Sequence, residues 1–470
     1  MKALLFVAFL WATSCAASPR RVASHAPRTV MVQLFEWPWG AVGDECEQVL
    51  GPAGYAAVQV SPPQEHIVVS GAPWWERYQP VSYRLESRSG TEAEFAAMVA
   101  RCARAGVDVY ADVVLNHMTA GHGVGFAGTA YEHYRYGDLW SFSDFHHCGR
   151  NGDDGIRDFT NLYELQNCEL LGMADLDTGA SRVQERQAAY LNHLLDLGVK
   201  GFRVDAAKHM ASADLRNLFA RVPRPNYRVL ELILSPGEPV SAKDYAGVGD
   251  FNNFAYAYEL GKAFHAGDLA SLPGLAARTN IATDDAVVFL ENHDLERRPP
   301  TEQLLALHND PVLNRLGLVF LLTWPYGYPA VFSGYSFSDN DAGPPVDASG
   351  KITGTCKAPF TCVHRAEWLA RLVYFRNVTD REFRATNVWT ASPNVIAFGR
   401  SNAGHVVLSV APQARDLVVP TDLVPGRYCN IASDRPSDDC AEVDSAGALH
   451  VHIAPRSAFV ILDEARFKRR

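Results

Sequence analysis

The sequence predicts an eight-stranded parallel (β/α)₈ TIM barrel with an inserted domain after its third strand and a C-terminal antiparallel β-sandwich domain. Three observations indicate this. Short apolar runs alternate with helical patterns over most of the chain, one interval between consecutive runs is too long for a single strand–helix unit, and the pattern changes to short alternating runs near the C-terminus. Barrels of this class use about 250 residues for eight units, or roughly 30 residues per unit.

Seven strand-like runs fit this spacing. They cover residues 29–35, 56–60, 107–114, 201–205, 228–231, 286–292 and 330–332. Patterns with helical periodicity lie between several of them, at residues 92–105, 182–197 and 214–221. A further strand, the sixth of the barrel, is expected near residues 249–253, where the apolar signal is weakest.

The interval between the third and fourth strands exceeds one unit by roughly 60 residues. It is rich in Gly, Asp, His and Tyr, and we expect residues 116–177 to form an inserted domain. The barrel would then comprise residues 27–115 and 178–381. From residue 382 to residue 470, alternating runs at 395–398, 405–410 and 450–462 predict the antiparallel β-domain.

The composition is that of an ordinary globular protein. With 470 residues, of which 47% are hydrophobic and 20% charged, the chain can bury a large core and divide into two or three domains. Its formal net charge of −10 gives no electrostatic reason to expect nucleic acid or an anionic membrane as a partner. We therefore expect a monomer that acts on a neutral substrate.

Residues 1–18 have the pattern of a secretory signal peptide, with Lys2, an apolar stretch from residue 3 to residue 12, and small residues before the expected cleavage point. A membrane anchor is the weaker interpretation, because a spanning helix needs about 20 apolar residues. A lipoprotein attached through Cys15 is a second alternative, since residues 12–15 loosely resemble a lipidation box. The favoured prediction is a secreted, extracellular protein without a membrane span.

The cysteine count agrees with export. Eight cysteines follow Cys15, and an even number in an exported chain predicts four disulfides, although on the order of a hundred connectivities are open. The eight are Cys46, Cys102, Cys148, Cys168, Cys356, Cys362, Cys429 and Cys440.

Three acidic residues stand at the ends of apolar runs: Asp205, Glu231 and Asp294. Packing does not explain a carboxylate at the end of a buried strand, because an unpaired buried charge is costly. The first two acids are one unit apart and the last two are about two units apart. All three would therefore lie at the C-terminal face of the barrel, where such barrels hold their active sites.

Glycoside cleavage is a reaction that uses such acids, because one carboxylate attacks or stabilises the anomeric carbon while a protonated carboxyl donates to the leaving oxygen. Arg203 lies two residues before Asp205, on the same side of the strand, and would keep this aspartate ionised. Glu231 follows Val229 and Leu230, an apolar approach that would raise its pKa. Different surroundings thus predict opposite roles for the two acids.

Seven segments run in the order known from one family. They are FEW at 35–37, VQVSPP at 58–63, WWERYQPVSY at 74–83, DVVLNH at 112–117, GFRVDAAKH at 201–209, GEP at 237–239 and NHD at 292–294. Together they resemble the α-amylases of glycoside hydrolase family 13 from about residue 30 to about residue 380, and the tail resembles the C-terminal β-domain of that family. LGPAGY at 50–55, NCEL at 167–170 and DAGPP at 341–345 look most similar to secreted bacterial amylases related to the animal enzymes.

The resemblance implies endo-acting, retaining hydrolysis of internal α-1,4-glucosidic bonds in starch, glycogen and maltooligosaccharides. Asp205 would be the nucleophile, Glu231 the acid/base, and Asp294 the carboxylate that binds and distorts the sugar. The implied substrate contacts are Trp74, Trp75, Tyr78, Gln79, His117, Arg203, Lys208, His209 and His293. The alternatives are a transglycosylating or exo-acting relative, or an inactive glucan-binding homologue, which would usually have lost one of the acids.

The resemblance also implies calcium, held by the side chains of Asn116 and Asp175 and by the backbone carbonyls of Gln166 and His209. Chloride is not expected: Arg203 and Asn292 match two anion ligands of the animal enzymes, but the third position is Ala330. The implied disulfides are Cys46–Cys102, Cys148–Cys168, Cys356–Cys362 and Cys429–Cys440.

Overall fold

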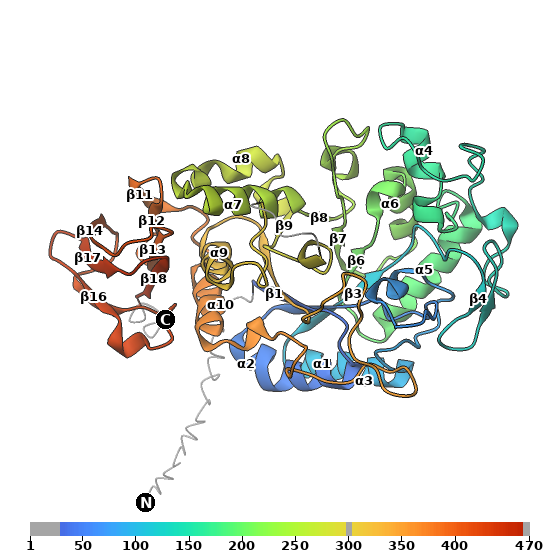
Figure 1. Ribbon diagram of the computed structural model, residues 1–470, viewed down its shortest axis with the longest axis horizontal. Helices are drawn as coiled ribbons and strands as arrows, with labels where there is room; N and C mark the ends of the chain where they lie inside the picture. The colour runs from blue at the N-terminus through green and yellow to red at the C-terminus, as the bar shows by residue number, and fades with distance from the viewer. Residues whose placement is uncertain (1–28, 298–302, 464–470) are drawn as a thin grey trace, which may run out of the picture.

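The structure of the chain is a computed structural model that describes residues 29–297 and 303–463. The predicted signal peptide and Cys15 lie outside the described residues. Eight strands form a closed barrel in the order β1-β10-β9-β8-β7-β6-β3-β2, and every neighbouring pair is parallel (Figure 1). The strands are β1 (Met31–Leu34), β2 (Ala57–Val60), β3 (Asp108–Val113), β6 (Gly201–Val204), β7 (Tyr227–Leu230), β8 (Asp250–Asn252), β9 (Ala286–Val288) and β10 (Tyr328–Ser333).

The barrel prediction is therefore confirmed, including its weakest strand, which is β8. Several runs were predicted a few residues too long, and the largest excess is at 286–292, where the strand leaves the ladder after Val288. The physical reason is the side chain of Asn292, whose Oδ1 accepts from the backbone N–H groups of Asp294 and Leu295 and so starts a turn. The chain therefore turns at this end of β9, and Asp294 lies on that turn.

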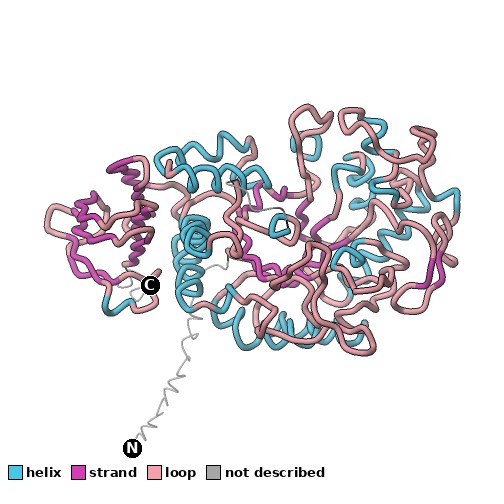
Figure 2. The backbone as a smooth tube through the Cα atoms, viewed as in Figure 1, coloured by secondary structure: helices cyan, strands magenta, loops and turns pink. Residues whose placement is uncertain are grey.

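Helices surround the barrel strands, as Figure 2 shows. Their starts have local causes: Thr91 and Glu94 form a capping box at α3, and the Asp310 carboxylate accepts from two backbone N–H groups at the start of α9. The α-helices are α1 (Trp39–Glu45), α2 (Gly51–Ala53), α3 (Glu92–Arg104), α4 (Leu162–Asn167), α5 (Ser181–Asp196), α6 (Ser212–Ala220), α7 (Phe254–Ala266), α8 (Leu275–Thr279), α9 (Pro311–Thr323) and α10 (Glu367–Thr379). None of the helices within the described ranges is long and apolar enough to cross a membrane.

The long segment between β3 and β6 forms a lobe beside the barrel, marked by β4 and α4 in Figure 1. It contains a small antiparallel pair, β4 (Gly123–Val124) and β5 (Ala130–Tyr131), together with α4. Tyr136, Trp140 and Phe145 of the lobe belong to an apolar cluster that also contains Ile67 and Val183 from outside it. The lobe is therefore packed against neighbouring parts of the barrel domain.

Two antiparallel four-stranded sheets, β11-β12-β13-β18 and β14-β17-β16-β15, form the C-terminal region. Their strands are β11 (Thr386–Ser392), β12 (Val395–Arg400), β13 (Gly404–Ser409), β14 (Arg415–Pro420), β15 (Gly426–Cys429), β16 (Cys440–Val443), β17 (Ala448–Ile453) and β18 (Ser457–Leu462). The run predicted at 450–462 is in fact two strands in different sheets. The break follows from Pro455, which cannot donate a ladder hydrogen bond, and from Arg456, whose φ is 45°.

Four disulfides join the cysteines in the pairs that the resemblance implied: Cys46–Cys102, Cys148–Cys168, Cys356–Cys362 and Cys429–Cys440. The first ties the π-helical turn that follows α1 to α3, and the second closes a loop of the inserted lobe. The fourth joins neighbouring strands β15 and β16, whose register places the two residues opposite each other.

Candidate active site

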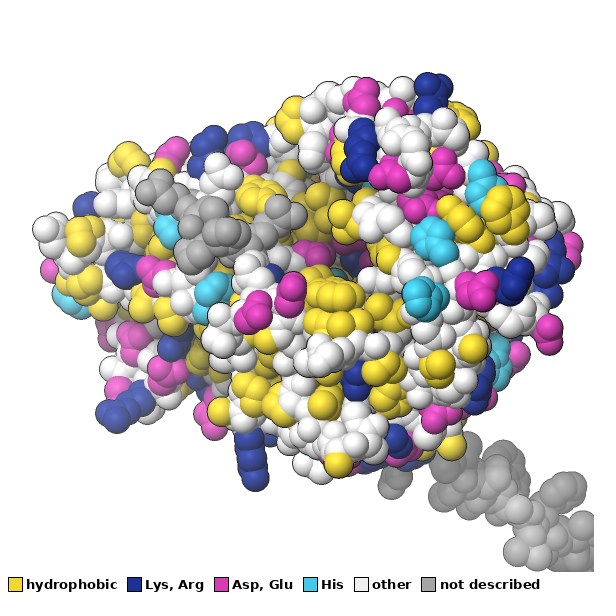
Figure 3. All heavy atoms as spheres, turned by 45° about the vertical axis from the view of Figure 1, so that its right-hand side comes forward, with side chains coloured by type: hydrophobic (Ala, Val, Ile, Leu, Met, Phe, Trp, Pro, Cys, Tyr) yellow, Lys and Arg dark blue, Asp and Glu magenta, His cyan; other side chains and the backbone are white. Residues whose placement is uncertain are grey.

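The three predicted acids meet at the C-terminal ends of the barrel strands. Asp205 follows β6 directly, Glu231 follows β7 directly, and Asp294 lies on the turn beyond β9. All three line one cavity of about 360 Å³. A hollow bordered by hydrophobic and acidic side chains is visible on the face of the molecule drawn in Figure 3. The same cavity brings together six of the predicted substrate contacts: Trp74, Trp75, Tyr78, Gln79, His117 and His293.

Arg203 forms ion pairs with two of these acids, Asp205 and Glu231, and with a further buried carboxylate, Asp112. Its Nη1 is 2.6 Å from Asp205 Oδ1 and 2.8 Å from Asp112 Oδ1, and its Nη2 is 2.5 Å from Glu231 Oε1. One guanidinium thus contacts three buried carboxylates, which raise the pKa of Arg203 well above its usual value. Asp112 belongs to β3, and sequence reasoning missed it, although its position in a buried strand was the same signal that identified the other acids.

The electrostatics differ from the expectation that Arg203 by itself keeps Asp205 ionised. Burial outweighs the guanidinium and raises the pKa of Asp205 to about 7 and that of Glu231 to about 8. Arg203 lowers the pKa of both acids, and neighbouring carboxylates raise both. The cation therefore does not distinguish the two acids, although the order of their pKa values is the predicted one.

Glu231 is further oriented by the backbone. The N–H of Ala206 donates to Glu231 Oε2 at 2.8 Å. Ala206 has a φ of 49°, a left-handed conformation that is costly for a residue with a Cβ atom. The strained turn after Asp205 thus points a hydrogen-bond donor at the neighbouring acid.

One wall of the cavity consists of stacked rings. His293 lies between Phe35 and Tyr78, with ring centroids 4.8 Å and 5.0 Å away, and Tyr78 donates a hydrogen bond to Asp112 Oδ2. Burial lowers the pKa of His293 to about 3, so its ring is neutral. Burial likewise lowers the pKa of His117 to about 4. Neutral imidazoles in a cavity suit hydrogen bonding to uncharged groups such as sugar hydroxyls.

The opposite wall comes from the inserted lobe and was not predicted. Leu170, Leu171 and Met173 line the cavity, and Leu171 is 86% exposed with a φ of 57°. Leu170 ends the NCEL motif, but Leu171 and Met173 are apolar residues outside the quoted motifs, so the sequence carried no signal that they line a cavity. Only the folding of the lobe against the barrel places them beside the acids.

Three predicted contacts do not line this cavity: Arg203, which lies under two of the acids, Lys208 and His209. Lys208 Nζ donates to Glu238 Oε1 at 2.8 Å and to the backbone carbonyl of Ile233 at 2.6 Å. His209 is buried, with Nδ1 2.9 Å from the carbonyl oxygen of Leu165. Both residues therefore lie behind the cavity wall, and Ile233, which lines the cavity, separates Lys208 from its interior.

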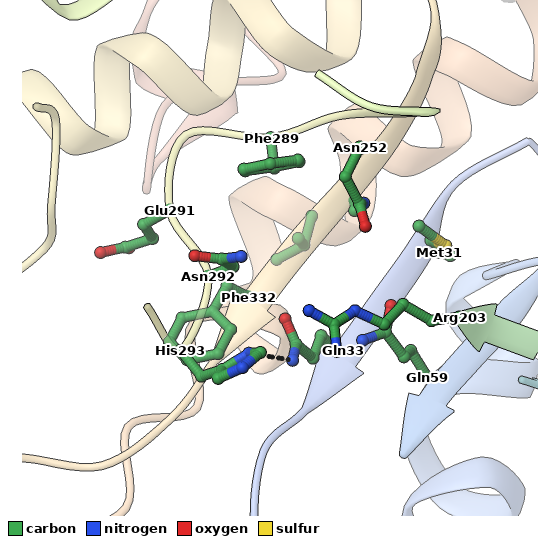
Figure 4. A pocket seen from close by; sticks show the side chains of 12 residues that line it. Met31, Gln33, Gln59, Arg203, Asn252, Phe289, Glu291, Asn292, His293 and Phe332 are labelled. Atoms are coloured by element: carbon green, nitrogen blue, oxygen red, sulfur yellow. Dashed lines mark hydrogen bonds between the residues drawn. The ribbon is translucent and has the colours of Figure 1, made fainter. Parts of the chain in front are cut away.

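A second, much smaller cavity of about 20 Å³ lies below the acids, enough for about one water molecule. Arg203, Asn292 and Ala330 all line it, and Figure 4 shows the first two facing it. Gln33 lies nearby, with Nε2 3.1 Å from His293 Nδ1. The methyl group of Ala330 supplies no charge here, so Arg203 is the one cation among the lining residues.

The predicted calcium ligands lie in two pairs of contacting segments: Asn116 contacts Asp175, and Gln166 contacts the loop that carries His209. Asn116 Nδ2 is 3.1 Å from Asp175 Oδ1, and both residues are buried. Burial raises the pKa of Asp175 to about 7, and the nearest cationic partner is His146, with Nδ1 2.7 Å from Oδ2. No hydrogen bond between described residues uses the backbone carbonyl oxygen of Gln166 or of His209. The ligand set thus consists of the buried carboxylate of Asp175, the side-chain amide of Asn116 and two backbone carbonyls that accept no hydrogen bond among the described residues. Oxygen atoms of these kinds are the ligands that Ca²⁺ takes.

One other group of side chains has metal-ligand character within the described ranges, formed by Cys356, Cys362 and His364. Its two cysteines form a disulfide, so they hold no thiolate for a metal. His364 is instead hydrogen-bonded to Ser333 and Glu45 in the core. This group is therefore structural.

Known proteins share both parts of this architecture. Family models match residues 77–227 (α-amylase, catalytic domain) and residues 387–463 (α-amylase, C-terminal all-beta domain). An α-amylase of Streptomyces violaceus is 39% identical over 446 residues, which cover 94% of this chain and 75% of that relative. An α-amylase of Pecten maximus is 38% identical, over 86% of this chain and 85% of the relative.

The solved structure of α-amylase I from Eisenia fetida has a TM-score of 0.88 and 31% identity, and the match covers 93% of this chain and 98% of that one. A mutant of the same earthworm enzyme has been solved in complex with maltohexaose. Relatives this similar over most of their length, on a barrel with acids at its strand ends, show that the chain belongs to the α-amylase family, glycoside hydrolase family 13, and is a starch-hydrolysing enzyme of it.

Proposed function

We propose that this enzyme cleaves internal α-1,4-glucosidic bonds of starch, glycogen and maltooligosaccharides with retention of configuration. The observation that carries this is the shared guanidinium of Arg203, which holds Asp205 and Glu231 side by side in one cavity. Retaining glycosidases need their two carboxyl groups about 5–5.5 Å apart. Asp205 is bound by Nη1 of Arg203 and Glu231 by Nη2 of the same guanidinium, an arrangement that is compatible with this separation.

In the proposed reaction Asp205 attacks the anomeric carbon while Glu231 gives its proton to the leaving oxygen, so that one C–O bond forms as the glycosidic bond breaks. Glu231 then takes a proton from water, and the water oxygen bonds to the anomeric carbon as the bond to Asp205 breaks, which releases the sugar. Burial raises the pKa of Glu231, which suits a group that must hold a proton, and the positive charge of Arg203 favours the ionised form that Asp205 needs for attack. Asp294 binds the sugar at the same point of the cavity.

The remaining contacts follow from position. Trp74, Trp75 and Tyr78 offer aromatic faces for sugar rings, and Gln79, His117 and His293 offer hydrogen-bonding groups. Arg203 is better placed to position the acids than to touch substrate. Lys208 and His209 would reach only a sugar beyond the described cavity.

The stereochemistry and length of the products test this proposal. Nuclear magnetic resonance of the first products should show the α-anomer, and blocked maltooligosaccharides should be cut internally. A β-anomeric first product would contradict the nucleophilic role of Asp205. Release of a single short sugar from one chain end, or transfer to another sugar in place of water, would favour the exo-acting or transglycosylating alternative.

Calcium is proposed at Asn116, Asp175 and the carbonyls of Gln166 and His209. When bound, the ion would supply positive charge to the buried Asp175 carboxylate and would link the lobe to the loop after β6. The two segments already touch, since Gln166 Nε2 lies 3.4 Å from the carbonyl oxygen of Lys208 and His209 Nδ1 lies 2.9 Å from that of Leu165. A chelator should lower the melting temperature, added Ca²⁺ should restore it, and Asp175→Asn should remove this response.

The enzyme is also proposed to be a secreted monomer with domain boundaries at residues 116–177 and 382. Four disulfides support an extracellular location, because such bonds persist in oxidising compartments. The mass and N-terminal sequence of the mature protein would separate a free secreted form from one with lipid on Cys15. Light scattering would measure the oligomeric state.

A further inference from the structure

The inserted lobe carries an exposed group of rings that takes no part in the catalytic cavity. Phe142 is 63% exposed and stacks on exposed His147, with ring centroids 3.8 Å apart and planes 15° apart. Tyr134 meets both rings edge-on, at 5.5 Å from Phe142 and 4.8 Å from His147. We call these three residues the Phe142 platform.

The platform is held rigidly. Asp144 is buried and its Oδ2 accepts from the backbone N–H and the hydroxyl of Ser141, at 2.8 Å and 2.9 Å, while its Oδ1 accepts from Arg182 Nε at 2.8 Å. His147 Nε2 is 2.9 Å from the carbonyl oxygen of Phe142. A single exposed apolar side chain needs no explanation, but here a turn with several fixed contacts presents stacked rings to water. Such preorganisation lowers the entropy cost of binding.

The chemistry of the platform suits a carbohydrate. Aromatic rings offer flat apolar faces to the C–H faces of sugars, and no aliphatic side chain contributes to the stack. Ser141 and Ser143 flank Phe142 in the chain, and their Oγ atoms lie 3.4 Å apart. An exposed stack of flat rings matches a pyranose better than it matches a protein surface, which usually adds aliphatic anchors and charges.

The platform and the catalytic cavity share one support. Tyr134 donates a hydrogen bond of 2.6 Å to Glu169 Oε1, and His133 Nε2 lies 2.7 Å from the same oxygen. Glu169 is buried and directly precedes Leu170 and Leu171, which line the cavity. The same short segment therefore fixes both the cavity wall and the platform in the lobe.

From these observations we infer that the Phe142 platform is a second contact site for α-glucan chains, separate from the catalytic cavity. The inference rests on the proposed substrate class. A polymer held there keeps further bonds near the acids, whereas a short oligosaccharide occupies the cavity without reaching the platform. Loss of the platform would therefore affect polymeric substrates selectively.

Phe142→Ala is the decisive variant, compared with Phe383→Ala, which removes an 80% exposed phenylalanine outside the lobe. Retardation in gels containing glycogen measures polymer binding, and turnover of a short blocked maltooligosaccharide measures the catalytic cavity. Phe142→Ala should weaken glycogen binding roughly two- to tenfold, the effect of losing one aromatic stacking contact. Short-substrate kcat/KM should stay at the wild-type value, and Phe383→Ala should change neither measurement.

Equal glycogen binding by the two variants would overturn the inference, and so would a matching loss in short-substrate kcat/KM, which would place Phe142 in the catalytic cavity. Phe142→Trp keeps a ring and should retain binding, which distinguishes loss of stacking from misfolding of the lobe. Failure of the proposed function has a different signature, because wild-type protein would then leave the blocked maltooligosaccharide uncut.

Discussion

Buried arginines at the two ends of the barrel have opposite surroundings. At the catalytic end, Arg203 contacts three carboxylates, and its pKa rises well above the usual value. At the other end, where α9 and α10 meet the C-terminal sheets (Figure 1), Arg400 donates to the backbone carbonyls of Thr323, Thr379 and Glu382. Burial lowers the pKa of Arg400 to about 9. Among described residues, this second arginine has no carboxylate within ion-pair distance.

Arg376 repeats the second arrangement, donating to the carbonyls of Trp324 and Gly327, and burial lowers its pKa to about 10. Thr323 ends α9 and Thr379 ends α10, so these arginines satisfy carbonyl groups that helix termini leave without partners. A buried cation that donates hydrogen bonds to backbone carbonyls stabilises the junction between the barrel and the C-terminal sheets. A buried cation that binds several carboxylates keeps reactive groups together, and perturbed acids of this kind mark a functional site.

The largest effect is expected at the acids themselves. Asp205→Asn and Glu231→Gln should each lower kcat on a blocked maltooligosaccharide by at least about 10⁴-fold, since in the proposed mechanism each removes a group that forms or breaks a bond in the transition state. Melting temperatures should not fall, because an amide replaces a carboxyl of the same shape. Either variant with near wild-type turnover would remove that residue from the proposed mechanism.

Removing the cation at the catalytic end should have the next largest effect. Arg203→Met should lower kcat/KM by roughly 10²–10³-fold, a loss similar to that of one preorganised electrostatic contact. Wild-type kcat/KM should be bell-shaped in pH, falling below about 7 as Asp205 gains a proton and above about 8 as Glu231 loses one.

The pH profile sharpens that test. Arg203 lowers the pKa of both acids, so Arg203→Met should move both limbs of the profile to higher pH. Arg203→Lys keeps a positive charge and should move them less. Unchanged limbs in an active Arg203→Met enzyme would contradict the role given to this guanidinium.

Where α9 and α10 meet the C-terminal sheets, replacing a buried arginine by methionine should lower stability and leave catalytic turnover unchanged. Arg400→Met leaves three carbonyls without their donor, and we expect the free energy of unfolding to fall by roughly 2–4 kcal/mol. Turnover of folded protein should remain close to wild-type. Arg427→Met, at an exposed site of β15, is the matched control and should change stability little. Denaturant unfolding followed by circular dichroism measures both variants.

The smallest expected effect concerns chloride. With Ala330 in place of a second cation beside Arg203, kcat/KM should change by less than about twofold when chloride is replaced by a larger inert anion. Steady-state assays at constant ionic strength measure this. Strong activation by chloride would show that the small cavity below the acids holds an anion with Arg203 as its only cation.

Much of this arrangement could be read from local patterns. The strand runs at 57–60 and 201–204 are apolar enough to be buried on both faces, which is the pattern of a parallel sheet. Asp205 and Glu231 were identified because each stands where such a run ends, and parallel strands end on the same face. The end of β9 and the division of 450–462 into two strands were harder to predict. The first depends on hydrogen bonds to the side chain of Asn292, and the second on the left-handed conformation of Arg456.

By itself, the sequence determined the barrel fold, the placement of its acids at the ends of strands, and the family. Hydrophobic periodicity and ordered motifs are properties of neighbouring residues, so they can be read from the sequence. Only the tertiary structure decided that Arg203 also binds Asp112 and Glu231, that Leu171 from the inserted lobe borders the acids, and that Lys208 and His209 lie behind the cavity wall. These contacts join segments far apart in the chain. Their geometry depends on how separate elements pack, and no local pattern encodes that.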